Sequence, residues 1–183
     1  MENLNVPTRE EVSENNQQIF DNLNAKLGFV PNLYATFAHS DTALGDYLAF
    51  QNRKSSLKAK EREVINLVVS QVNECEYCQA AHTALGKMNG FTDEQILELR
   101  SGSASFDEKL DALVKFAKET TIERGHPSQD AIDELLAVGY TKESIVDIII
   151  VIGDKIVSNF LHGIGGFQVD FPAAPALEEV AVA

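Results

Sequence analysis

The chain has 183 residues, of which 44% are hydrophobic and 23% charged, and it is long enough for one globular domain with its own core. Its 28 acidic residues against 15 basic ones give a net charge of −13. This balance disfavours nucleic acid and anionic membrane as partners, because both bind through basic patches. A membrane span is not expected, because the most apolar run, residues 145–164, is interrupted by Asp147, Asp154, Lys155 and Asn159.

The first five residues lack the basic and apolar regions of a signal peptide, so we expect a cytoplasmic protein. The two cysteines, Cys75 and Cys78, form a C-x-x-C pair. In a reducing compartment such a pair is more often redox-active or metal-binding than a structural disulfide.

Capping residues and helical periodicity predict helices throughout the first half of the chain. Residues 8–11 have the form of a capping box, which predicts that a helix begins at Thr8 and continues to a stop at Gly28. Asp41 is a predicted cap for a second helix, followed by a third after the turn at residues 55–56. An apolar segment, 33–38, lies between the first two. The helices expected here are 8–27, 41–53 and 57–71.

The second half shows the same pattern. Asn73 is a predicted cap for a helix that contains the cysteines and stops at Gly90. Thr92 opens a capping box, and Ser128 and Thr141 are further predicted caps. The β-branched run 148–152 could form a buried strand by local preference, but its length and flanks favour a helix. The helices expected here are 75–89, 92–100, 106–124, 128–139 and 141–163.

No strand-like alternation and no glycine-rich phosphate loop occurs in the sequence. We therefore predict an all-α fold, a single-domain helical bundle over residues 1–170. Proline and alanine are frequent in the last segment of the chain, so residues 171–183 are predicted to form an extended C-terminal arm.

One face of one predicted helix carries the chemistry. At about 100° per residue, Cys78 and His82 project within roughly a 60° arc of Cys75. A thiol reacts as its thiolate, which a helix N-terminus stabilises, and an imidazole can accept or relay the proton. Glu63, on the preceding helix, can orient that imidazole if the two helices fold back on each other.

These residues resemble the AhpD-like alkyl hydroperoxidases of the carboxymuconolactone decarboxylase superfamily. The resemblance lies in Glu63, then twelve residues to Cys75, three to Cys78 and four to His82, and extends more weakly over residues 28–90. It implies an all-α AhpD-like bundle that assembles into homo-oligomers, such as dimers, trimers or hexamers.

The resemblance also implies roles for the site residues. Cys78 would be the peroxidatic thiol and Cys75 the resolving thiol, with Glu63 and His82 as a proton relay. The redox-active disulfide would replace any cofactor, a hydroperoxide would be the substrate and an external dithiol the reductant. Tyr77 stands where well-characterised members carry a histidine, and it could offer a hydroxyl or simply pack.

Three other interpretations of the pair remain open. Cys75, Cys78, His82 and Glu63 could bind zinc, although three ligands on one helix leave little to cross-link. The cysteines could be small core residues, or the pair could serve a general thiol–disulfide oxidoreductase with little peroxidase activity.

The remaining candidate residues receive structural interpretations. The other histidines are expected at surfaces, turns or helix ends, and Asp154 and Asn159 are expected to be satisfied within an interface, with no chemical role. The histidines concerned are His39, His126 and His162.

Overall fold

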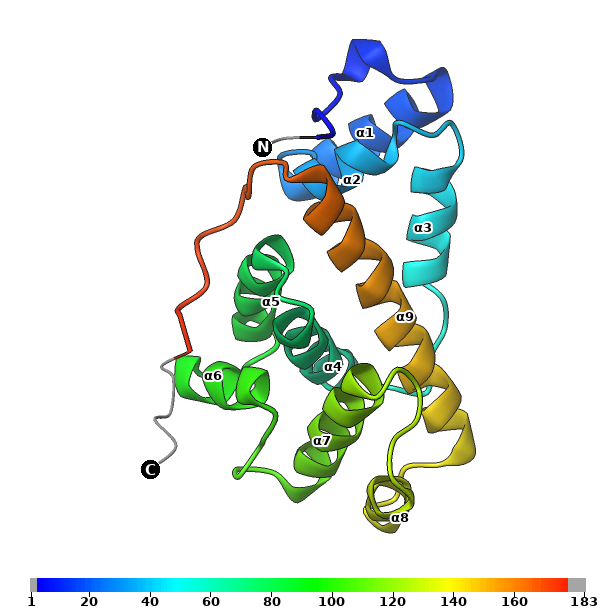
Figure 1. The fold of residues 1–183 in the computed structure, drawn as a ribbon. Coiled ribbons are helices and arrows are strands. Elements are labelled where there is room, and N and C mark those ends of the chain that lie inside the picture. The colour runs from blue at the N-terminus through cyan, green and yellow to red at the C-terminus, as the bar shows by residue number, and fades with distance from the viewer. Residues whose placement is uncertain (1–2, 178–183) are drawn as a thin grey trace. The chain divides into compact units, whose positions relative to one another are not determined.

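Every regular element between residues 3 and 177, the part of the chain that this computed structural model describes, is a helix, and no strand occurs there. The predicted all-α, single-domain fold is thereby confirmed (Figure 1). The elements are the 3₁₀ helix η1 (Arg9–Glu11) and the α-helices α1 (Glu14–Leu27), α2 (Asn32–Phe37), α3 (Ala43–Gln51), α4 (Ala59–Val72), α5 (Glu76–Met88), α6 (Asp93–Ser101), α7 (Glu108–Ile122), α8 (Gln129–Ala137) and α9 (Lys142–Gly165).

The N-terminal capping box closes a separate 3₁₀ turn and does not open the first long helix. The Glu11 carboxylate accepts the backbone N–H of Thr8 at 2.7 Å, and Val12 then adopts an extended conformation. The hydroxyl of Ser13 caps α1 by accepting the N–H of Asn16. The prediction of one continuous helix from Thr8 is therefore wrong, because a capping box satisfies the first N–H groups of any helical turn, however short.

Two other predicted N-caps are displaced along the chain. Thr42, and not Asp41, precedes α3, and Cys75, and not Asn73, precedes α5. Asn73 instead ends α4. Hydroxyl caps form as predicted on α6 and α8, at Thr92 and Ser128.

The longest helix, α9, contains the β-branched run 148–152, so the prediction of a helix there is confirmed. Its 24 residues satisfy their own backbone hydrogen bonds along the helix, which a strand could do only with a neighbouring strand. Among the described helices, none is both long and apolar enough to cross a membrane.

Residues 3–54 and 160–170 form one of two compact units. The buried amide of Asn16 donates to the backbone carbonyls of Ala38 and Ser40, which ties α1 to the turn after α2. The backbone N–H of Asn32 donates to Asp170 at 2.7 Å. The buried apolar core of this unit consists of Val12, Phe20, Ala35, Ala38 and Leu44.

Residues 55–159 and 171–177 form the second unit, which contains every residue of the predicted thiol site. The helix α4 lies at its centre, with α5, α6 and α7 packed against it (Figure 1). Full burial of an aliphatic side chain stabilises a fold by about 1.5–3 kcal/mol. Because α4 is surrounded, a charged side chain that it carries inward is costly unless it is paired. The apolar residues of α4 with no exposed surface are Val64, Ile65, Leu67, Val68 and Val69.

Residues 171–177 of the second unit have no regular secondary structure. The ring of Phe171 meets the ring of Tyr77 edge-on, with centroids 5.6 Å apart. The guanidinium of Arg100 on α6 donates to the carbonyl of Pro175 at 2.6 Å, where the red segment of Figure 1 reaches α6. The predicted arm is thus irregular as far as residue 177. Its remaining residues, 178–183, lie outside the described part of the chain, and the proposed boundary at residue 170 stays a prediction.

Candidate active site

A tight turn between α4 and α5 brings both cysteines to the start of a helix. Glu74 has a φ of 53°, a left-handed conformation that few residues other than glycine adopt, and the N–H of Cys75 donates to the carbonyl of Ser70 at 3.0 Å. Cys75 then caps α5, because its sulfur accepts the N–H of Cys78 at 3.3 Å. Both thiols therefore lie where unpaired helix N–H groups favour an anion.

The two sulfur atoms lie next to each other in a buried site. Cys75 and Cys78 are 3% and 2% exposed, and their Sγ atoms are 2.7 Å apart, with the Cys75 thiol donating toward Cys78. Both cysteines are free thiols. Since a disulfide bond is about 2.05 Å long, the pair can be oxidised with little movement of the backbone.

Glu63 and His82 meet across the α4–α5 contact. The Nδ1 atom of His82 lies 2.6 Å from a carboxylate oxygen of Glu63, and both side chains are buried. Burial by itself raises the pKa of Glu63, but electrostatic attraction to His82, the hydrogen bond from His82 and a hydrogen bond from Asn66 outweigh it, and the pKa is lowered. Glu63 is thus a carboxylate that fixes the imidazole in one orientation.

A buried lysine occupies the other side of the imidazole. The Nζ atom of Lys155 on α9 lies 3.0 Å from Nε2 of His82 and 3.5 Å from a carboxylate oxygen of Asp154, and the lysine is 2% exposed. The Glu63 carboxylate can only accept and the ammonium can only donate, so the imidazole carries its proton on Nδ1 and accepts at Nε2. Glu63, His82 and Lys155 therefore form a continuous chain of hydrogen bonds.

Asn159, one turn beyond Lys155 on α9, directs a buried amide at the site. Its Oδ1 atom accepts a hydrogen bond from Asn73 at 2.9 Å, which fixes which way the amide points. Its Nδ2 atom is buried and makes no hydrogen bond of ordinary geometry. The same amide nevertheless favours the ionised form of both cysteines. It is a donor available to an anion at the thiol pair.

These neighbours shift the pKa values of the two thiols in opposite directions. The hydrogen bond from Cys75 lowers the pKa of Cys78 most and burial opposes it. Electrostatic attraction to Lys155 and His82 and a hydrogen bond from the amide of Asn159 bring the pKa to about 6. The hydrogen bond to Cys78, together with burial, raises the pKa of Cys75. These shifts favour the thiolate on Cys78 and the thiol on Cys75.

The structure brings together all four residues predicted from the sequence, and it adds two that the sequence analysis missed. Asn159 was expected only at an interface, and Lys155 was noticed only as an interruption of an apolar run. The available signal was their spacing, since a lysine and an asparagine four residues apart on a nearly all-apolar helix share one face. Long buried helices rarely carry such polar groups without a function or a partner.

Tyr77, between the cysteines, is 1% exposed, and its ring packs against Phe171. Two of the remaining histidines contact backbone carbonyls within the first unit. Nε2 of His39 donates to the carbonyl of Asn5 at 2.8 Å, and Nε2 of His162 donates to that of Phe167 at 3.2 Å.

The residues proposed as zinc ligands are not arranged as a metal site. Between residues 3 and 177 no three His, Cys, Asp or Glu side chains converge in a way that could hold a metal ion. His82 has Glu63 on one ring nitrogen and Lys155 on the other, so neither nitrogen is available to a metal.

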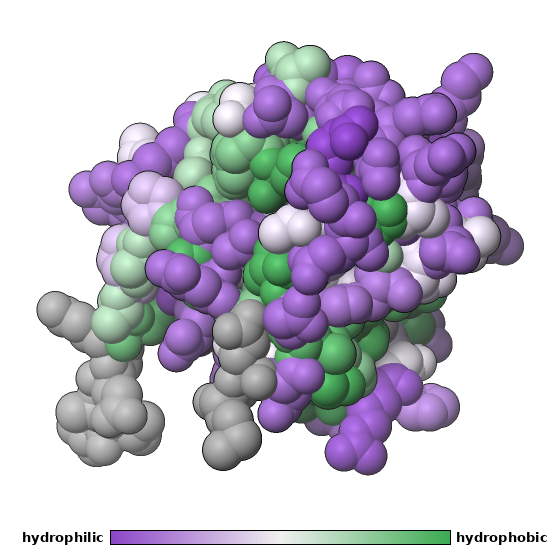
Figure 2. Space-filling view, turned by 90° about the horizontal axis from the view of Figure 1, so that it is seen from above, coloured by the Kyte–Doolittle hydropathy of each residue, from purple (hydrophilic) through white to green (hydrophobic). Residues whose placement is uncertain are grey.

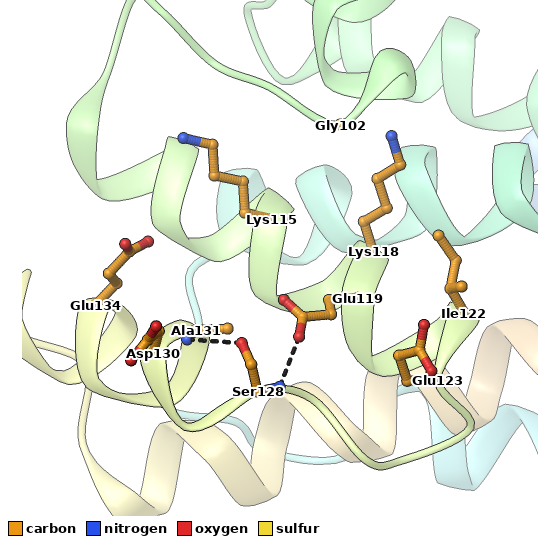
Figure 3. A pocket seen from close by; sticks show the side chains of 10 residues that line it. All are labelled: Gly102, Lys115, Lys118, Glu119, Ile122, Glu123, Ser128, Asp130, Ala131 and Glu134. Atoms are coloured by element: carbon orange, nitrogen blue, oxygen red, sulfur yellow. Dashed lines mark hydrogen bonds between the residues drawn. The ribbon is translucent and has the colours of Figure 1, made fainter.

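A surface hollow of about 420 Å³ in the second unit lies elsewhere, with side chains of α7 and α8 lining it (Figure 3). Three of its charged groups are paired within the protein. Lys118 donates to the carbonyl of Ser101, Lys115 binds Asp111, and Glu119 accepts the N–H of Ser128, the last of which Figure 3 draws. None of the thiol-site residues lines it. The hollow therefore has no buried donor or acceptor that calls for a ligand.

The sequence and the fold were compared with those of known proteins. Residues 35–119, which contain Glu63, both cysteines and His82, match the family described as the carboxymuconolactone decarboxylase family. No curated protein sequence is significantly similar to the chain. The match over residues 35–119 agrees with the resemblance to the carboxymuconolactone decarboxylase superfamily inferred from the sequence.

Solved structures share the fold over nearly the whole chain. An uncharacterized peroxidase-related protein from Silicibacter sp. TM1040 is 25% identical with a TM-score of 0.80, covering 91% of this chain and 89% of that one. An alkylhydroperoxidase AhpD core, an uncharacterized peroxidase-related protein from Ralstonia eutropha JMP134, is 23% identical with a TM-score of 0.81, covering 91% and 90%. The debrominase Bmp8, in complex with 2,3,4-tribromopyrrole, is 16% identical with a TM-score of 0.75, covering 92% and 91%.

Proposed function

Because residues 35–119 belong to the carboxymuconolactone decarboxylase family, we propose that this protein is a thiol-dependent peroxidase of the AhpD-like type. The observation that carries the proposal is the buried thiol pair, in which the sulfurs are 2.7 Å apart and the ionised form is favoured on Cys78 alone. A peroxidatic thiol must be a thiolate with a second thiol within reach, and this pair supplies both.

In the first step the Cys78 thiolate attacks the terminal oxygen of a hydroperoxide. The S–O bond forms as the O–O bond breaks, so Cys78 is oxidised to a sulfenic acid and the peroxide leaves as an alkoxide. The Cys75 thiol, whose proton is directed toward Cys78, gives that proton to the alkoxide and becomes a thiolate. The product is an alcohol.

In the second step the Cys75 thiolate attacks the sulfur of the Cys78 sulfenic acid. The S–S bond forms as the S–O bond breaks, and the hydroxide that leaves takes up a proton and becomes water. An external dithiol then exchanges with the disulfide, returns two electrons and restores both thiols. No cofactor enters this cycle.

The same pair also suits a general thiol–disulfide oxidoreductase, which would attack a disulfide and not a peroxide. Burial favours the peroxidase, because cysteines that are 2–3% exposed admit a small hydroperoxide more readily than the disulfide of a folded protein. A disulfide-bonded protein substrate would have to approach both sulfurs closely for exchange.

Steady-state reduction of organic hydroperoxides with several dithiol donors tests the proposal. We expect turnover with at least one donor, and we expect the Cys75→Ser variant to accumulate a sulfenic acid on Cys78 that a dimedone probe can label. Reduction of model disulfides without any hydroperoxide turnover would select the oxidoreductase. A label that appears on Cys75 in the reciprocal Cys78→Ser variant, at the wild-type rate, would reverse the assigned roles.

The exposed face of α9 supports a homo-oligomer. Hydrophilic residues dominate the face of the molecule in Figure 2, where apolar residues gather in small groups. The helix α9 exposes a series of large apolar side chains at helical spacing. A second copy of the chain could cover them, and sedimentation velocity measures the resulting mass. The exposed apolar residues are Val146, Ile149, Val157, Phe160 and Ile164.

The reducing conditions that keep such thiols active are those of the cytoplasm, which we propose as the location of this protein.

A further inference from the structure

Two helices of the second unit carry matched pairs of polar residues, each pair four residues apart. Cys78 and His82 lie one turn apart on α5, and Lys155 and Asn159 lie one turn apart on α9. His82 contacts Lys155 at 3.0 Å, and the amide of Asn159 acts on Cys78. The lysine therefore meets the imidazole, and the asparagine one turn later acts on the thiol one turn earlier.

The ring nitrogens of His82 are both occupied, which limits what the imidazole can do. Nδ1 donates to Glu63 at 2.6 Å, and Nε2 accepts from Lys155 at 3.0 Å. An imidazole in this state has no lone pair left for the proton of a thiol. Glu63 and His82 alone are thus an incomplete account of how Cys78 is activated.

Lys155 is the one cationic side chain that these contacts place in the site among the described residues. A lysine is almost never fully buried unless it is paired, and this one is 2% exposed. Its ammonium contacts a neutral imidazole nitrogen at 3.0 Å, and a carboxylate oxygen of Asp154 lies 3.5 Å away. The positive charge of Lys155 also acts on Cys78, where it favours the thiolate.

We propose that Lys155 is the group that stabilises the Cys78 thiolate, and that Glu63 and His82 act on Cys78 through it. In this arrangement the Glu63 carboxylate fixes the Nδ1–H tautomer of His82, and Nε2 then holds the ammonium in position beside the thiol pair. Lys155 is a positioning residue, since it acts by its charge and takes part in no bond that forms or breaks. The inference rests on the proposed function only for the choice of Cys78 as the reacting thiol.

The charged and titratable groups around Lys155 come from three helices. Glu63 faces the site from α4, the two cysteines and His82 from α5, and Asp154 from α9 itself. Two carboxylates and a thiolate thus share one ammonium. Lys155 lowers the pKa of Cys78 more than His82 does. The thiolate therefore loses its main cationic neighbour when the lysine is made neutral.

The test measures how the alkylation of Cys78 depends on pH, with the labelled residue identified by mass spectrometry. In the wild type we expect the rate to rise through a midpoint near pH 6, because the lowered pKa makes the thiolate dominant above that pH. Lys155→Gln should move the midpoint upward by about 1 to 3 pH units, and Lys155→Arg should restore most of the difference. Lys87→Gln, which removes an exposed lysine of α5, is the matched control and should leave the midpoint unchanged.

A folded Lys155→Gln variant, checked by circular dichroism, with the wild-type midpoint would overturn the proposal. Alkylation needs no peroxide, so a protein without peroxidase turnover but with a shifted midpoint would remove the proposed function and leave this inference standing. Should the glutamine variant not fold, nitrogen-15 NMR of histidine-labelled wild-type protein decides. A proton on Nδ1 and none on Nε2 of His82 through the titration of Cys78 supports the arrangement, and a proton on Nε2 rejects it.

Discussion

Two buried carboxylates, Glu61 and Glu63, stand two residues apart on α4 and serve different purposes. At about 100° per residue they point to nearly opposite sides of the helix. Glu61 accepts the backbone N–H of Lys58 at 2.8 Å, the hydroxyl of Tyr140 at 3.0 Å and the ammonium of Lys109 at 3.2 Å. These bonds cap α4 and hold neighbouring elements against it.

Glu63 instead binds His82, which continues through Lys155 toward the thiol pair. Both carboxylates are buried, and the pKa of each is lowered by partners that outweigh the cost of burial. Neither burial nor a lowered pKa therefore distinguishes Glu63, for which we propose a role at the thiol pair, from Glu61, which holds the fold together. What separates them is whether the chain of partners ends at a reactive group, as it does for Glu63, or in packing, as it does for Glu61.

Two substitutions should differ most in their effect: Cys78→Ser, at the end of the Glu63 chain, and Tyr140→Phe, which removes a partner of Glu61. Without the Cys78 thiolate, hydroperoxide reduction should fall to the uncatalysed rate, because a serine hydroxyl does not ionise near neutral pH. Without the Tyr140 hydroxyl, stability should fall by about 1 kcal/mol while turnover stays at the wild-type level. Coupled peroxidase assays and urea denaturation measure the two quantities. Residual peroxidase activity in Cys78→Ser would place the reacting thiol elsewhere.

A moderate difference should separate Glu63→Gln from Glu61→Gln. Glutamine at residue 63 no longer enforces the Nδ1–H tautomer of His82, so Lys155 loses its acceptor and the alkylation midpoint of Cys78 rises. A rise of about one pH unit would lower the reactive fraction at pH 6 about fivefold. Glutamine at residue 61 should leave the midpoint in place and reduce the stability by about 1–3 kcal/mol.

The distinction between Glu61 and Glu63 is wrong if Glu61→Gln and Glu63→Gln change the alkylation midpoint and the stability to the same extent. Equal shifts of the midpoint would mean that any change to α4 disturbs the thiols, and equal losses of stability with no shift would remove Glu63 from the site. The alkylation profile and the denaturation midpoint are both needed, because each variant is expected to move only one of them strongly.

The smallest effect concerns the amide of Asn159. Asn159→Ala removes one hydrogen-bond donor from the thiol pair, so the midpoint of Cys78 alkylation should rise by about 0.5 to 1 pH unit. Asn73→Ala leaves that donor in place and removes only the bond that orients it, so its shift should be smaller. If the two variants shift the midpoint equally, the effect comes from movement of the α4–α5 turn and not from the amide.

Predictions from the sequence succeeded where the chemistry lies within a few residues of the chain. Cys75, Cys78 and His82 share a helix, so their spacing alone placed them on one face. The predicted caps at Thr92 and Ser128 are present for the same reason. The capping box at Thr8 predicted a helix that was too long, because it closes a turn of three residues that ends before α1.

The site residues on α9 could not be predicted from spacing within one segment. Lys155 and Asn159 lie more than seventy residues beyond the cysteines, and no local pattern says which helix their face meets. Glu63 was placed correctly only through the family resemblance and the expectation that α4 and α5 fold back on each other. The spacing from Glu63 to the cysteines did not predict that Glu61, two residues earlier, is also buried.

The sequence by itself determined the helices, the thiol pair and the imidazole one turn away, because these depend on hydrogen bonds and spacings within single segments. The tertiary structure decided which groups meet the two ring nitrogens of His82, in which direction the pKa of each thiol moves, and which lysine lies against the imidazole. Those properties depend on distances between α4, α5 and α9. Electrostatic interactions in a buried site are set by such distances, and the order of residues along the chain does not contain them.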